Sequence, residues 1–244
     1  MNKVPLALAL VAASAGFAQD PREIVKEVQR RQHATSQRHE GTLEVTGSQN
    51  RIATKRWIYQ RLGSFGQSKA ILRFTAPAEV KGVALLVVNH ADRASDQWMW
   101  TPAIGRDRRI ALQDRSTRFF GTDFSFEDLE ERDADQYDFK LLAEEGGVWK
   151  IESRPRKSSQ YAYSYFWIRK DNFTFQKIEA YNKKGLVRAI DYKDYEQVKG
   201  IWSARTTEVF DAIRGSRTIL KTEKLDYNLP FREEDFTLQA LRRE

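Results

Sequence analysis

The residues of this chain that could carry acid–base chemistry lie close together in one short segment. Asp123, Glu127 and Asp128 cluster there, and two well-placed carboxylates suffice for general acid–base catalysis of a hydrolysis. The same segment predicts the start of a short helix, because Ser125 and Asp128 have the spacing of a capping box. Since the helix macrodipole stabilises carboxylates at a helix start, we favour a structural role for them.

The sequence lacks the other common catalytic signatures. It contains no glycine-rich phosphate loop, no G-x-S-x-G turn and no H-E-x-x-H motif. The absence of cysteine excludes disulfides, thiolate zinc sites and cysteine nucleophiles. We assign His33, His39 and His90 to local hydrogen bonding, because a metal site needs several converging ligands. We therefore predict a protein that is not an enzyme, with no catalytic residue, metal or cofactor.

A formal net charge of +7 makes nucleic acid the first partner to consider. Four cations between Arg51 and Arg61 flank Trp57 and Tyr59, a mixture of charges and stacking rings typical of single-strand binders. An alternation of cations with aromatic rings is equally typical of a half-buried strand. Export of the chain, indicated by its N-terminus, argues against nucleic acid as the partner.

The first 18 residues have the composition of a secretory signal peptide. Lys3 is followed by an apolar run from Val4 to Ala15 and then by small residues, which predicts cleavage after Ala18. The run is shorter than the roughly 20 residues of a membrane-spanning helix, and no cysteine is present for lipid attachment. We therefore expect a signal peptide over 1–18 and a soluble, unanchored periplasmic domain over 19–244.

The mature chain predicts one helix followed by many strands. Asp20-Pro21 opens a helix that runs to about Thr35. Beyond it the hydrophobic period changes to two, and residues 82–88 are apolar on both faces, which indicates a covered central strand. From about Gln136 to Asn228, turn residues punctuate a meander of strands whose short connections make neighbours antiparallel.

These elements predict a mainly β single domain with few helices. An open, flat sheet of this size would expose an apolar face, so the sheet must curl around its helices. We expect a strongly curved antiparallel sheet that forms an unclosed half β-barrel with helices covering the concave side. Such an arrangement leaves a cavity between the two layers.

Four segments of the chain resemble the outer membrane lipoprotein-sorting protein family, the LolA-like group. These segments are Arg73–Gly82, Gln97–Pro102, Arg108–Ile110 and Phe120–Leu129. The later stretches Asp191–Tyr195 and Val198–Trp202 are similar to the meander of the same family. The chain departs from the family pattern at Trp202-Ser203, where a proline is expected soon after the glycine.

The resemblance implies the unclosed barrel of LolA, LolB and LppX, with helices plugging the concave side. It also implies a monomeric carrier that shields acyl chains of lipoproteins or other lipids between the inner and outer membranes. Partners implied are an RND/MMPL-type exporter in the inner membrane and an outer-membrane acceptor. Because each buried methylene contributes about 0.8 kcal/mol, an apolar cavity can hold a lipid without a covalent step.

Two alternatives stay open at this point. The chain could be a non-catalytic accessory subunit of an envelope transporter that binds protein rather than lipid. It could also be a secreted hydrolase that uses the carboxylates from Asp123 to Asp128.

Strand parity selects the side chains that we expect to line the lipid cavity. They are Trp57, Leu72, Phe74, Leu86, Trp98 and Trp100, with Phe120 and Phe124 near the rim. A further aromatic series, Tyr161, Tyr163, Tyr165 and Trp167, fits core packing and a cavity wall equally well.

Overall fold

The structure is a computed structural model that describes residues 19–47, 51–131 and 133–243. The predicted signal peptide, residues 1–18, lies outside the described residues. The described strands are β1 (Ser36–Thr46), β2 (Ile52–Ser64), β3 (Gln67–Ala76), β4 (Ala84–Asn89), β5 (Asp96–Thr101), β6 (Arg106–Arg109), β7 (Tyr137–Glu145), β8 (Val148–Pro155), β9 (Tyr163–Arg169), β10 (Phe175–Asn182), β11 (Gly185–Val198), β12 (Ile201–Asp211) and β13 (Ser216–Tyr227). The described helices are α1 (Pro21–Arg31), α2 (Leu238–Leu241) and the short 3-10 helices η1 (Leu112–Asp114), η2 (Glu127–Leu129), η3 (Ala134–Gln136) and η4 (Glu233–Phe236).

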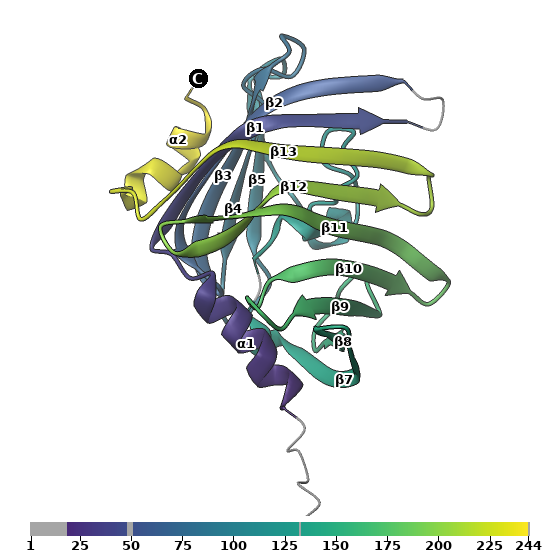
Figure 1. Cartoon of the computed structure of the whole chain (residues 1–244). Helices are drawn as coiled ribbons and strands as arrows, with labels where there is room; N and C mark the ends of the chain where they lie inside the picture. Colours follow the sequence, from purple (N-terminus) through teal and green to yellow (C-terminus); the bar gives the residue numbers. More distant parts are fainter. Residues whose placement is uncertain (1–18, 48–50, 132, 244) are drawn as a thin grey trace, which may run out of the picture.

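These strands form one sheet in the spatial order β6-β5-β4-β3-β2-β1-β13-β12-β11-β10-β9-β8-β7. Every neighbouring pair within it is antiparallel. Figure 1 shows the sheet bending sharply, so that β3–β5 run across the direction of β10–β13. The prediction of a strongly curved antiparallel sheet that does not close into a barrel is confirmed.

The strand order joins two meanders at a single seam. One meander runs outward from β1 to β6, and the other runs from β7 to β13. They meet where β1 pairs with β13, with Gln37 opposite Tyr227 and Thr46 opposite Arg217. Because β6 and β7 are the two edges of the sheet, the chain between them must travel from one edge to the other. We call this connection, residues 110–136, the strap.

The strap fills one half of the concave side. Its Phe119 stacks on Phe74 of β3 with the ring centroids 5.4 Å apart, and its Phe126 belongs to the same apolar cluster as Leu85 of β4. Phe74 is completely buried, with 0% of its surface exposed. Over β1–β4 the concave side is therefore a packed core.

Helix α1 covers the other half of the concave side. Asp20 caps it by accepting a hydrogen bond from the backbone N–H of Arg22 at 2.9 Å, as the Asp-Pro start predicts. Its buried stripe, Ile24, Val25 and Val28, packs in one cluster with side chains of β8 and β9. The helix ends at Arg31 rather than near Thr35, because the chain already pairs as β1 from Ser36 onward.

The C-terminal segment packs on the opposite face of the sheet. Phe236, Ala240 and Leu241 lie in one cluster with Ile71 of β3 and Leu86 of β4, and Figure 1 shows α2 outside the curve of the sheet. This second cover explains why β4 is apolar on both faces. Leu85 faces the strap, whereas its neighbour Leu86 faces the C-terminal segment.

We predict that Phe74→Ala lowers the free energy of unfolding by about 3–5 kcal/mol, because it opens a cavity between β3 and the strap. Ile104→Ala is the matched control, since Ile104 is 68% exposed and its truncation should change stability by less than about 0.5 kcal/mol. Urea unfolding, monitored by tryptophan fluorescence, measures the free energy of unfolding of both variants. Similar small losses in the two variants would contradict a packed strap core.

Candidate functional site

An apolar groove lies between α1, the strap and the concave face of β7–β13. Its volume is about 540 Å³, within the range of about 300–1,000 Å³ typical of small-molecule sites. Val25 and Val28 of α1 lie on one side of it. The facing sheet contributes an apolar wall that includes Phe139, Phe166, Phe175, Ile178, Ile190 and Leu220.

The strand register explains why this wall is continuous. Ile178 of β10 lies directly opposite Phe166 of β9 on one side and Ile190 of β11 on the other. Side chains that are opposite in neighbouring antiparallel strands point to the same face of the sheet. Three adjacent strands therefore present one apolar row to the groove.

A second cavity, of about 390 Å³, lies on the other side of the strap. Except for Ala94 and Leu112, its lining consists of polar and charged side chains, among them His90, Arg93 and Lys157. Because it offers little apolar wall, the groove is the better candidate for an apolar ligand.

One end of the groove is polar, and the strap supplies its carboxylates. Glu131 forms an ion pair with Arg61 of β2 and accepts a hydrogen bond from the Ser68 hydroxyl at 2.9 Å. Arg61 is only 3% exposed. Burial raises the pKa of the Glu131 carboxyl, and the charge of Arg61 opposes that rise. This pair ties the strap to β2.

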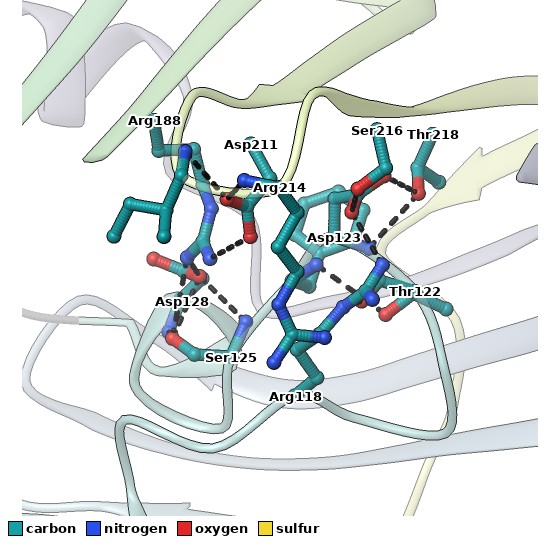
Figure 2. Close-up of polar contacts among 12 residues, drawn as sticks. Arg118, Thr122, Asp123, Ser125, Asp128, Arg188, Asp211, Arg214, Ser216 and Thr218 are labelled. Atoms are coloured by element: carbon teal, nitrogen blue, oxygen red, sulfur yellow. Dashed lines mark hydrogen bonds and ion pairs between the residues drawn. The ribbon is translucent and has the colours of Figure 1, made fainter. Parts of the chain in front are cut away.

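A second buried ion pair ties the strap to β11 (Figure 2). Asp128 pairs with Arg188, which is 3% exposed. The Asp128 carboxylate also accepts hydrogen bonds from the Ser125 hydroxyl at 2.7 Å and from the Tyr161 hydroxyl at 2.6 Å. Burial, with the negative charge of Asp128, raises the pKa of Tyr161. Asp211 lies 3.6 Å from the same guanidinium.

A third anchor joins the strap to β13 (Figure 2). Asp123 is fully buried and pairs with Arg118 of the strap itself. It accepts hydrogen bonds from the Ser216 hydroxyl at 2.5 Å and the Thr218 hydroxyl at 2.8 Å. The fold therefore satisfies this buried charge from the strap and from the sheet together.

The three carboxylates singled out in the sequence thus have structural partners. The predicted capping box is present, since Ser125 and Asp128 each accept from the other's backbone N–H, at 3.3 and 2.6 Å. Glu127 accepts from the Ser159 hydroxyl at 2.5 Å and from the Gln160 backbone at 2.9 Å. This pairing favours the structural interpretation over hydrolysis.

The histidines occupy separate parts of the fold. His90 lies 3.0 Å from Asp96, whereas His39 packs edge-on against Tyr59 and Tyr227 with centroids 5.8 and 6.1 Å apart. Within the ranges that the structure describes, no group of three His, Asp or Glu side chains is arranged to hold a metal ion.

The eight predicted cavity residues lie outside the lining of the groove. Four of them, Trp57, Leu72, Phe74 and Phe120, belong to the packed core beneath the strap. Leu86, Trp98 and Trp100 face the C-terminal segment on the other side of the sheet. Phe124 is half-buried in the strap, where its carbonyl accepts from Phe119 at 2.9 Å. Contact of these residues with a lipid stays a prediction.

The aromatic series near β9 divides between the two faces. Tyr161 and Phe166 line the groove, whereas Tyr163 and Trp167 point to the outer face. There Tyr163 stacks on Tyr181 with the centroids 5.0 Å apart.

Sequence reasoning missed the groove lining of β10 and β11, although their alternating apolar residues were a usable signal. It could not locate Arg188, which lies 60 residues from its partner Asp128.

No helix in the described ranges combines the length and apolar character needed to span a membrane.

Comparisons with known proteins place this arrangement among solved folds. A family model described as "-like: Uncharacterized protein" matches residues 66–243. The chain is similar to a crystal structure described as an outer membrane lipoprotein-sorting protein domain from Vibrio parahaemolyticus, with 28% identity, a TM-score of 0.87 and coverage of 91% of this chain and 98% of that one. No curated protein matches the chain.

Two further crystal structures share the fold. A DUF1329 family protein from Desulfovibrio piger has 24% identity and a TM-score of 0.86, over 91% of this chain and 99% of that one. A LolA superfamily protein from Nitrosomonas europaea has 19% identity and a TM-score of 0.73, over 91% of this chain and 100% of that one.

We predict that Asp128→Asn lowers the free energy of unfolding by about 3–5 kcal/mol, because the buried Arg188 then keeps only the more distant carboxylate of Asp211, at 3.6 Å, as a countercharge. Asp171→Asn is the control, since Asp171 pairs with Arg169 at the surface, where a pair contributes less than about 1 kcal/mol. Chemical unfolding of both variants tests this expectation. Equal, small losses would contradict an anchoring role for Asp128.

We predict that His39 makes the stability of the fold depend on pH. Burial, together with the charges of Arg61 and Arg205, lowers the pKa of this imidazole from 6.5 to about 3. Between those two values the unfolded chain binds more protons than the folded chain, so stability falls as the pH is lowered.

His39→Phe keeps the ring contacts and removes this proton site. From pH 7 to pH 4.5 the wild-type chain should lose about 2–3 kcal/mol more unfolding free energy than His39→Phe. Urea titrations at the two pH values measure the difference. The same loss in both proteins would show that His39 is not the responsible group.

Proposed function

We propose that this chain, whose structural neighbours are outer membrane lipoprotein-sorting, LolA-like superfamily proteins, carries the acyl chains of lipoproteins or other lipids between membranes. The fold is the carrier-type fold of that superfamily. Residues 19–244 would act as one periplasmic carrier domain after removal of the signal peptide.

The observation that carries the proposal is the apolar wall of the groove. A row of side chains from β9, β10 and β11, with Ile178 at its centre, faces α1 across an open space. Each acyl methylene that moves from water onto this wall contributes about 0.8 kcal/mol to the free energy of binding. Binding of a hydrocarbon chain therefore needs no covalent step and no cofactor.

Transfer requires release as well as binding. A ligand moves only when the acceptor offers it a lower free energy than the groove does. We propose that direction comes from partners, an RND/MMPL-type exporter on the inner membrane and an acceptor on the outer membrane. Helix α1, which covers the groove through a stripe of only three buried residues, is the element that a partner would displace.

We predict that the mature chain purified without detergent carries a lipid seen by native mass spectrometry and takes up a fluorescent fatty acid. Ile178→Trp should weaken this uptake about tenfold or more, because losing contact with two methylenes already suffices for that change. Ile52→Trp is the matched control, since Ile52 is 67% exposed on β2, outside the groove, and should bind like the wild type.

Absence of bound lipid together with absence of uptake would overturn the proposal. Equal uptake by wild type and Ile178→Trp would move the binding site away from the groove.

A further inference from the structure

One end of the sheet carries exposed cations from three neighbouring connections. Figure 1 shows the turn between β10 and β11, the turn between β12 and β13 and the facing ends of β1 and β2 on the same side of the molecule, at the right. The register agrees, since Thr46 lies opposite both Ile52 and Arg217. We call residues 51–52, 182–186 and 210–217 the basic end. Its exposed cations are Arg51, Lys183, Lys184, Arg214 and Arg217.

The charges of the basic end are not balanced within it. Its single acidic residue, Asp211, is only 4% exposed and lies 3.6 Å from the buried Arg188. Further along β11, Lys193 pairs with Glu208 at 2.8 Å, whereas none of the five exposed cations has a carboxylate partner among the described residues. Five such charges are a large share of an excess of +7 for the whole chain. The basic end therefore attracts anions.

Exposed apolar side chains lie beside these cations. Ile52 is 67% exposed and follows Arg51, while Ile213 is 68% exposed and precedes Arg214. Six large apolar side chains are exposed in the described part of the chain, and with Phe210 the basic end holds three of them. Cations that meet lipid phosphates, together with apolar side chains that enter between the headgroups, are typical of surfaces that bind anionic membranes.

The composition of the basic end favours a membrane over other anionic partners. Lysine is depleted in protein–protein interfaces, whereas two of the five cations here are lysines in one turn. Single-stranded nucleic acid is bound through aromatic rings on which the bases stack, and the most exposed apolar side chains here are isoleucines. A lipid surface accepts lysines and isoleucines alike.

We propose that the basic end docks this protein on an anionic phospholipid surface. None of its exposed cations or isoleucines lines the groove, so the docking surface is separate from the groove and its test does not depend on the carrier function. Strands β10 and β11, which the turn with Lys183 and Lys184 connects, also supply Ile178 and Ile190 to the apolar wall. Docking therefore brings the turn between two strands of that wall to the membrane.

Binding to vesicles tests the proposal. Vesicles of phosphatidylcholine that contain about one third phosphatidylglycerol present an anionic surface, whereas phosphatidylcholine alone is neutral. In flotation experiments at low salt, the mature chain should bind the anionic vesicles at least about tenfold more strongly than the neutral ones. About 0.5 M sodium chloride should remove most of this difference, because it screens exposed charges.

Two double variants separate the basic end from the overall charge of the protein. Lys183→Gln with Lys184→Gln should weaken binding to the anionic vesicles about thirtyfold, the effect of two cations near an anionic surface. Lys140→Gln with Lys224→Gln is the control, because it removes the same charge from exposed positions outside the basic end. The control should weaken binding by less than about threefold. Near-UV circular dichroism reports that both variants are folded.

The isoleucines distinguish a membrane from an acidic protein. Ile213→Ser should weaken binding to the anionic vesicles about fivefold, because the apolar side chain that leaves water on docking is then absent. Ile104→Ser is the matched control, since Ile104 is also 68% exposed but lies in the turn between β5 and β6. It should bind like the wild type.

Several outcomes would overturn the docking surface. These are equal binding to both kinds of vesicle, no binding to either, and equal losses in the two lysine pairs. Binding to polyglutamate as tight as to the anionic vesicles, with Ile213→Ser bound like the wild type, would identify an acidic protein as the partner instead. None of these results decides the carrier function, which fatty acid uptake by the wild type and by Ile178→Trp tests separately.

Discussion

The buried contacts between the strap and the sheet determine the rest of this structure. Asp128 pairs with Arg188 of β11 and Glu131 pairs with Arg61 of β2, so the strap is fixed on both sides of the β1–β13 seam. Removing one partner from such a pair is far more destabilising than the pair is stabilising. The pairs therefore specify where the strap lies, while the apolar contacts of Phe119 supply the favourable burial.

This fixed path divides the concave side into two unequal halves. Over β1–β4 the strap inserts large apolar side chains and leaves a core. Over β7–β12 the cover is α1, which lies against the sheet by a narrow stripe, and a groove stays open beside it. The residues that anchor the strap also form the polar end of that groove. The side chains of these two ion pairs thus both anchor the strap and line the groove.

The sequence predicted local features well and long-range ones poorly. The Asp20 cap, the Ser125–Asp128 capping box and the period-two strands depend on neighbours in the chain, and the structure has them. Strand parity puts Leu85 and Leu86 on opposite faces of the sheet, as the structure has them, but parity does not tell which face or which half stays open. Which half of the concave side stays open depends on the path of the strap. That path is set by Arg61 and Arg188, which lie far from the strap in the sequence.

In the proposed carrier function, the groove must hold its ligand without holding it too well, and its apolar wall and its polar end contribute differently to binding. The apolar wall gives affinity in proportion to chain length and to no other feature of the ligand. The polar end adds little affinity, because its arginines are already balanced by Asp128 and Glu131. A charge-balanced polar end therefore leaves the free energy of binding to the apolar wall, and a bound chain stays free to leave when an acceptor offers it a lower free energy.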